Sequence, residues 1–105
     1  MTETDIQRTI LEFLKLIKVP AWRNNTGRRG HVTYGLCTGS SDIIGIYRGK
    51  FLAIEVKVPG KHAEPDQKEF LNIVTGAGGI GFVAHSVDEV REKLISYVEA
   101  SHNGL

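Results

Sequence analysis

The stretch DIIGIYRGKFLAIEVK, residues 42–57, decides the fold. Residues 42–47 and 51–58 are rich in β-branched and aromatic side chains, which favour strands. Between them, Arg48-Gly49-Lys50 is short and centred on glycine, as in a tight turn. This stretch therefore predicts a β-hairpin of two adjacent strands.

The second strand of this hairpin has two different faces, because side chains alternate along a strand. One face carries Glu55 and Lys57, together with Phe51 and Ala53. An ordinary half-exposed strand could carry the same charged pair, and Glu-Val-Lys is a weak motif by itself. The opposite face is wholly apolar and is expected to face the core: Leu52, Ile54, Val56 and Val58.

Helices are predicted on both sides of the hairpin. The first begins at Thr2, which forms a capping box with Asp5, and ends at Pro20. The second begins at Pro65 and is stopped by the glycines of residues 76–79. Their apolar faces follow helical spacing: Ile6, Ile10, Phe13, Leu14 and Ile17 in the first, Phe70, Leu71 and Val74 in the second.

The remaining segments complete a mixed α/β layer fold. Residues 21–41 are polar and glycine-rich, with at most a short strand or two. Residues 80–85 form a short apolar strand, expected to be central in the sheet. A third helix follows the capping box of Ser86 and Glu89. The predicted order is helix, glycine-rich segment, strand, strand, helix, strand, helix.

Length and composition limit the function classes. A chain of 105 residues with a net charge of +1 predicts one compact domain, without the overall basicity of a histone-like binder. Any nucleic-acid contact must therefore rest on local positive charge. Cys37 is the only cysteine, so an intrachain disulfide and a cysteine-based zinc site are excluded, and a small buried side chain is expected. With no signal-peptide pattern and no membrane span, the cytoplasm is the expected location.

Two carboxylates are expected to converge at the hairpin. Asp42 opens the strand next to the one that bears Glu55. Paired carboxylates form a hard oxygen site suited to Mg²⁺ or Mn²⁺, which can activate water for attack on a phosphodiester. Lys57 beside them could stabilise the transition state or orient that water. Asp42 could instead be an ordinary strand-start residue after Gly39-Ser40-Ser41.

Two further polar residues share apolar helical faces. Glu3 lies near the centre of the first helix's apolar stripe, although a first-turn acid is also favoured by the helix dipole. Gln67 shares the face of Phe70 and Leu71. It could hold a catalytic water or a carboxylate, or it could cap its own helix.

Basic residues gather in two loops. Arg28, Arg29 and His31 lie in the flexible stretch before Asp42, and Arg48 and Lys50 lie at the hairpin tip. Arginine pairs on a surface are usually just solvated. Positive loops around a carboxylate site would nevertheless suit a polyanionic substrate, because they offset its repulsion from the acids.

The motifs together resemble the VRR-NUC domain, a branch of the PD-(D/E)XK nuclease superfamily. The likeness rests on residues 2–7 (TETDIQ), 39–46 (GSSDIIGI), 51–57 (FLAIEVK) and Gln67, and it spans nearly the whole chain. It implies a stand-alone nuclease domain with a restriction-endonuclease-like αβββαβ core and a C-terminal helix. Ser41 departs from the pattern, since it stands where the superfamily's name has proline.

The resemblance also implies site roles and a function. Asp42 and Glu55 would bind the metal with the backbone carbonyl of Val56, and Lys57 would be the catalytic lysine. Glu3 would be the first-helix acid and a further candidate ligand, and Gln67 the supporting glutamine. Stand-alone members resemble four-way (Holliday) junction resolvases that act as homodimers.

A homodimer agrees with elementary geometry, because symmetric cutting of a two-fold junction needs two active sites. Apolar residues left over from one core, Trp22, Tyr34 and Leu36, are candidate dimer contacts. The alternatives are a flap or duplex nuclease, a non-catalytic DNA-binding module of the same fold, and a small-molecule-binding α/β protein.

Overall fold

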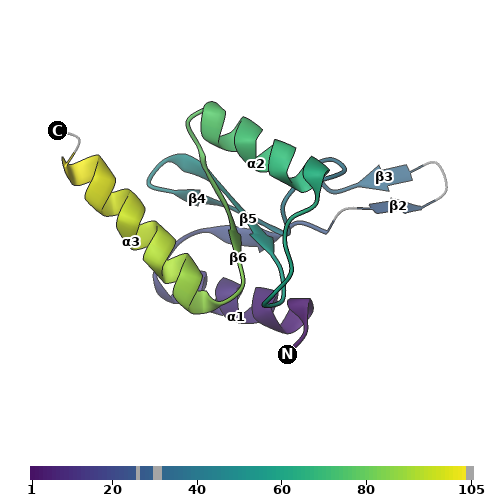
Figure 1. The fold of residues 1–105 in the computed structure, drawn as a ribbon, viewed down its shortest axis with the longest axis horizontal. Helices are drawn as coiled ribbons and strands as arrows, with labels where there is room; N and C mark the ends of the chain where they lie inside the picture. Colours follow the sequence, from purple (N-terminus) through teal and green to yellow (C-terminus); the bar gives the residue numbers. More distant parts are fainter. Residues whose placement is uncertain (26, 30–31, 104–105) are drawn as a thin grey trace.

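A computed structural model describes residues 1–25, 27–29 and 32–103, and its side chains are described outside 27–34 and 100–103. A four-stranded mixed sheet lies between helices in this structure (Figure 1). In chain order the elements are α1 (Glu3–Leu16), β1 (Ala21–Arg23), β2 (Gly27–Arg29), β3 (Val32–Tyr34), β4 (Ile43–Tyr47), β5 (Lys50–Val56), α2 (Pro65–Gly76), β6 (Ile80–Ala84) and α3 (Val87–Asn103).

The sheet has the strand order β1-β4-β5-β6. The β1/β4 and β4/β5 pairs are antiparallel, and β5/β6 is parallel across the helical crossover of α2. This topology confirms the predicted αβββαβ core. The predicted central position of residues 80–85 is wrong, since among the described residues β6 pairs only with β5. Its apolar character instead comes from the helices that cover it.

The β4–β5 hairpin closes in a two-residue turn. Arg48 and Gly49 both have positive φ, 52° and 80°, which is the backbone that tight hairpin turns require. Lys50 already pairs with Tyr47, so it belongs to β5 rather than to the turn. The predicted hairpin is thus confirmed with strand ends shifted by one or two residues.

The main core lies between the sheet and the pair α1 and α3. Leu52, Ile54 and Val56 are fully buried there, as predicted from strand alternation. Ile10 and Leu14 of α1 pack into the same cluster. On the opposite face α2 covers Ala53 with Leu71 and Val74. This face of β5 is therefore buried at Ala53 and Glu55, whereas Phe51 at its other end is 42% exposed.

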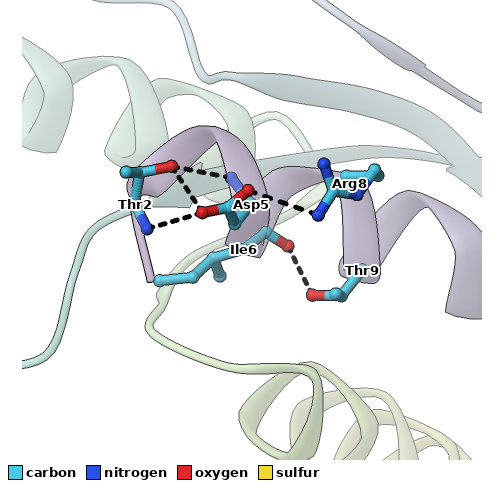
Figure 2. Close-up of polar contacts among 5 residues, drawn as sticks. All are labelled: Thr2, Asp5, Ile6, Arg8 and Thr9. Atoms are coloured by element: carbon cyan, nitrogen blue, oxygen red, sulfur yellow. Dashed lines mark hydrogen bonds and ion pairs between the residues drawn. The ribbon is translucent and has the colours of Figure 1, made fainter.

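The start of α1 is fixed by the predicted capping box. The Thr2 hydroxyl accepts a hydrogen bond from the Asp5 backbone N–H at 3.1 Å, and the Asp5 carboxylate accepts one from the Thr2 N–H at 2.9 Å (Figure 2). Arg8 adds an ion pair to Asp5 at 3.2 Å. Hydrogen bonds from Thr2 lower the pKa of the Asp5 carboxyl. These contacts begin the helix at Glu3, which sets where that acid lies.

Residues 21–41 contain three short strands, where at most two were predicted. β1 extends the main sheet, whereas β2 and β3 pair only with each other, from Gly27↔Tyr34 to Arg29↔Val32. Figure 1 shows this two-stranded arm projecting away from the sheet. Backbone pairing maintains these strands without an apolar pattern, so periodicity could not find them. The loop that follows leaves Cys37 exposed, contrary to expectation.

Within the described ranges, no helix has the combination of length and apolar character needed to cross a bilayer.

Candidate active site

Strand pairing brings Asp42 beside Glu55. Ile43 is paired with Ile54 in the antiparallel ladder. Asp42, which precedes Ile43, therefore lies across from Glu55, which follows Ile54. The Asp42 carboxylate is held in place, because its Oδ2 accepts a hydrogen bond from the Val56 N–H at 2.8 Å. Asp42 is therefore not a free turn residue but is fixed over the C-terminal end of β5.

Glu55 is a buried carboxylate with incomplete partners. Only 2% of its side chain is exposed, and its Oε2 lies 3.8 Å from the Nζ of Lys57. The other oxygen, Oε1, is buried and has no hydrogen-bond partner within the described part of the chain. An orphaned carboxylate oxygen is costly to bury, so it points to a group that the site is built to bind.

The electrostatics of the site favour an added positive charge. The pKa of Glu55 is raised to about 8: burial is the largest cause, the Asp42 carboxylate raises the pKa as well, and Lys57 lowers it by less. Glu3 contributes a smaller increase through its charge. Crowded carboxylates in a dry site disfavour ionisation until a cation joins them. A divalent ion would supply that charge.

The donor set fits a hard divalent cation that keeps part of its water shell. In residues 1–25, 27–29 and 32–103, no three His, Cys, Asp or Glu side chains converge as a ready-made metal cage. Asp42 and Glu55 could bind Mg²⁺ or Mn²⁺ with the carbonyl of Val56, leaving other positions to water and phosphate oxygens. Mg²⁺ is commonly bound in this way, through one or two carboxylates and substrate phosphates.

The two helical candidates have different surroundings. Glu3 is half-buried in the first turn of α1 and near enough to affect the pKa of Glu55, but it completes no three-residue metal group. Gln67 is half-buried, and its Oε1 accepts a hydrogen bond from the Glu64 N–H at 2.8 Å. Its side-chain oxygen therefore caps α2, the second of the two roles considered for it.

Two of the predicted basic residues lie away from the acids. Arg48 and Lys50 lie at the far end of β5 from Glu55. Lys50 and Glu55 are five positions apart along the strand, which is about 16 Å. Proximity to the acids therefore cannot argue for this pair. Arg28 and Arg29 lie in β2, with undescribed side chains, and His31 is outside the described residues.

His85 fastens the loop that follows Lys57. Its Nε2 lies 2.9 Å from the Lys61 carbonyl oxygen, and its Nδ1 lies 3.0 Å from Glu89 of α3. These two acceptors, the Glu89 carboxylate foremost, raise the pKa of His85. A structural role was expected for this histidine, and its contacts join the loop after Lys57 to α3.

Sequence reasoning missed Asn24, which lies just after β1. It is 8% exposed, and its backbone N–H donates to the Asp42 carbonyl at 2.7 Å. Its side-chain Nδ2 donates to the Ser40 hydroxyl and the Ser41 carbonyl, both at 2.9 Å. The pair Asn24-Asn25 in a polar segment contains no signal that separates a buried amide from an exposed one.

Removal of the Ser40 hydroxyl and removal of the Ser41 hydroxyl are expected to have different effects on stability. The Ser40 hydroxyl accepts from Asn24 and donates to the Cys37 carbonyl at 2.7 Å. The Ser41 hydroxyl is fully buried without a hydrogen-bond partner among the described residues. Ser40→Ala is expected to lower the free energy of unfolding by about 1–2 kcal/mol, whereas Ser41→Ala should leave it unchanged or raise it by up to about 1 kcal/mol. Urea titrations of both variants measure this, and equal losses would contradict it.

Comparisons with known proteins support the fold. No family model matches the sequence, and no curated protein matches it either. Among solved structures, a "VRR_NUC domain protein" matches with a TM-score of 0.73 and 25% identity, over 94% of this chain and 89% of the other. The chain therefore has the VRR-NUC nuclease fold.

Proposed function

We propose that this chain, a protein of the VRR-NUC fold, is a Mg²⁺- or Mn²⁺-dependent endodeoxyribonuclease that cuts branched DNA, with four-way junctions as its foremost substrate. The observation that carries the proposal is the buried cluster of Asp42, Glu55 and Lys57 at the end of β5, with an orphaned Glu55 oxygen. The VRR-NUC likeness supports nuclease chemistry in general.

The residues of the cluster divide the work. Asp42, Glu55 and the Val56 carbonyl would hold the ion, which polarises the phosphodiester and lowers the pKa of bound water. The Lys57 ammonium, only 13% exposed beside Glu55, would stabilise negative charge as it develops on the phosphate and orient the attacking water. Glu3 would add negative charge to the ion site. Gln67, whose Oε1 caps α2, would be the supporting glutamine that holds the start of α2 beside the site.

The basic residues of the two loops are proposed to contact DNA, with Arg28 and Arg29 nearest the scissile bond. Arg28 and Arg29 lie on the β2–β3 arm, whose root at Asn24 is hydrogen-bonded to Asp42. A two-stranded ribbon fits a DNA groove, and adjacent arginines would contact phosphates. Arg48 and Lys50 would contact DNA further from the scissile bond, and His31, which lies outside the described residues, stays a candidate DNA contact.

A second class of function is a non-catalytic DNA-binding module. A binding surface has no use for a carboxylate whose pKa is raised to about 8 by burial. A buried acid of this kind costs stability unless a ligand compensates it. The cluster therefore favours catalysis.

A homodimer is part of the proposal, and an uncovered part of the sheet supports it. α2 makes its main sheet contacts with β5 and β6, so among the described helices it leaves the same face of β1 and β4 largely uncovered. Trp22, Ile46 and Phe51 lie on this face and are 55%, 48% and 42% exposed. Leu36, also named as a candidate contact, is 53% exposed, whereas the Tyr34 side chain is outside the described part. Exposed apolar side chains gathered on one sheet face suit a protein partner.

Ile46→Glu is expected to convert a dimer into a monomer, because it places an unpaired charge on that face. Leu16→Glu is the matched control, since Leu16 is 81% exposed at the end of α1. Sedimentation equilibrium of the wild type and both variants measures the mass. A monomeric wild type at working concentrations removes the dimer.

The function is tested by cleavage of labelled four-way junction, flap and linear duplex DNA in Mg²⁺, Mn²⁺ or EDTA. Metal-dependent cutting of the junction at symmetric positions supports the full proposal. Cutting of the flap or duplex alone keeps the nuclease and removes junction resolution. If folded protein binds DNA but cuts no substrate in either metal, the binding module replaces the nuclease.

A further inference from the structure

Asn24 connects three separate parts of the chain. Its backbone N–H and side-chain Nδ2 donate to the Asp42 and Ser41 carbonyls at 2.7 and 2.9 Å. Its Oδ1 accepts from the Leu36 N–H at 3.3 Å. The contacts therefore join the end of β1, the loop after β3 and the segment that enters β4. Such a buried amide is satisfied only when all three parts keep their places.

The same contacts control the position of Asp42. Its side chain depends on one short hydrogen bond to Val56, so the carboxylate stays over β5 only if its own backbone is held. Asn24 holds that backbone from the other side, through the carbonyls of Ser41 and Asp42. The Ser40 hydroxyl accepts a hydrogen bond from Asn24 and donates one to the Cys37 carbonyl, so it also links this segment to the loop after β3. A shift of about 1 Å in this segment would be enough to separate a metal ligand from its partner.

We propose that Asn24 is a positioning residue that holds Asp42 in the geometry needed to bind the divalent ion. Asn24 does not touch the ion or the DNA phosphate; it acts through Asp42. The inference rests on the proposed function, because it takes Asp42 as a metal ligand. Asn24 is thus a buried amide outside the acidic cluster on which metal binding by the cluster depends.

The test compares Asn24→Asp with Asn25→Asp. Asn24→Asp keeps the size of the side chain but removes the donor that faces the Ser41 carbonyl. Asn25→Asp makes the same charge change at an exposed neighbour. Without DNA, the dissociation constant for Mn²⁺ is obtained for both from the dependence of Tm on Mn²⁺ concentration. Asn24→Asp is expected to need about 10–100-fold more Mn²⁺ than the wild type, and Asn25→Asp less than about threefold more.

Cleavage provides a second measurement that separates positioning from general destabilisation. At saturating Mn²⁺ the Asn24→Asp rate should return to within about threefold of the wild type, because the ion itself restores Asp42 to place. A variant that is only less stable would bind Mn²⁺ with unchanged affinity below its Tm. Unchanged affinity for Mn²⁺ in Asn24→Asp would overturn the proposal.

A second variant covers the case in which Asn24→Asp does not fold. Ser40→Ala removes one acceptor of the Asn24 amide and should raise the dissociation constant for Mn²⁺ by a smaller factor, about threefold. Ser41→Ala is its control and should leave the Mn²⁺ affinity unchanged. Equal affinities for these two variants would count against the proposal. The Tm measurements need no cleavage, so a folded protein that binds Mn²⁺ but cuts nothing would remove the proposed function alone.

Discussion

Lys57→Ala is expected to lower the cleavage rate by about 10²–10⁴-fold while metal binding persists. The Lys57 ammonium is nearly buried, 13% exposed, and lies 3.8 Å from the Glu55 Oε2. At that position it can stabilise a charged transition state, a contribution that alanine cannot replace. Because Lys57 repels a divalent ion, its removal should leave the ion's affinity unchanged or higher.

The control for Lys57→Ala is Lys61→Ala. Lys61 is exposed four residues further along the chain, and its side chain makes no ion pair within the described ranges. Both substitutions remove one positive charge, so a general loss of attraction for DNA would affect both. Single-turnover rates and the Mn²⁺-induced rise in Tm are measured for each. Loss of the Tm shift in Lys57→Ala would assign the lysine to the architecture of the ion site rather than to catalysis.

The hairpin and the acidic cluster could be predicted because they depend on local pattern. Alternation along residues 51–58 identified the core face, and pairing of the two strands placed Asp42 beside Glu55. Burial of the Glu55 face could not be predicted, because it depends on α2 packing over Ala53. A motif of weak specificity thus became a buried cluster only through tertiary packing.

Other features depended on pairing that the sequence does not encode locally. β6 is as apolar as a central strand, but two covering helices explain that character equally well. Arg48 and Glu55 are close in sequence, yet an extended strand keeps them at opposite ends. Asn24 and Asp42 are distant in sequence but hydrogen-bonded. Sequence separation is therefore a poor guide to membership of this site, in both directions.

Glu55→Gln is expected to abolish cleavage and, in metal-free protein, to raise stability at pH 8. Burial raises the pKa of Glu55 from an ordinary 4.5 to about 8. Between these values the folded protein binds a proton that the unfolded chain does not, so the free energy of unfolding falls as pH rises. The loss is complete above the folded pKa. Glutamine cannot ionise, and it removes a penalty on the order of 4 kcal/mol at pH 8.

Chemical denaturation in EDTA from pH 5 to pH 9 measures the Glu55→Gln effect. His85 also has a raised pKa, and it too stabilises the folded state below its unfolded value and less so as pH rises. The wild-type curve minus the Glu55→Gln curve cancels that contribution and isolates Glu55. A difference that does not vary with pH would show that this carboxyl titrates normally.

Saturating Mn²⁺ should reverse the order of the two proteins at pH 8. The ion binds the ionised carboxylate of the wild type, so binding adds to its stability what burial had removed. Glu55→Gln keeps Asp42 and the Val56 carbonyl but loses an anionic ligand, so the same Mn²⁺ should raise its stability much less. In a site that binds a cation, the buried carboxylate lowers stability in the free protein and raises it once the ion is bound. If Mn²⁺ stabilises both proteins equally, Glu55 is not a ligand, and its burial has another cause.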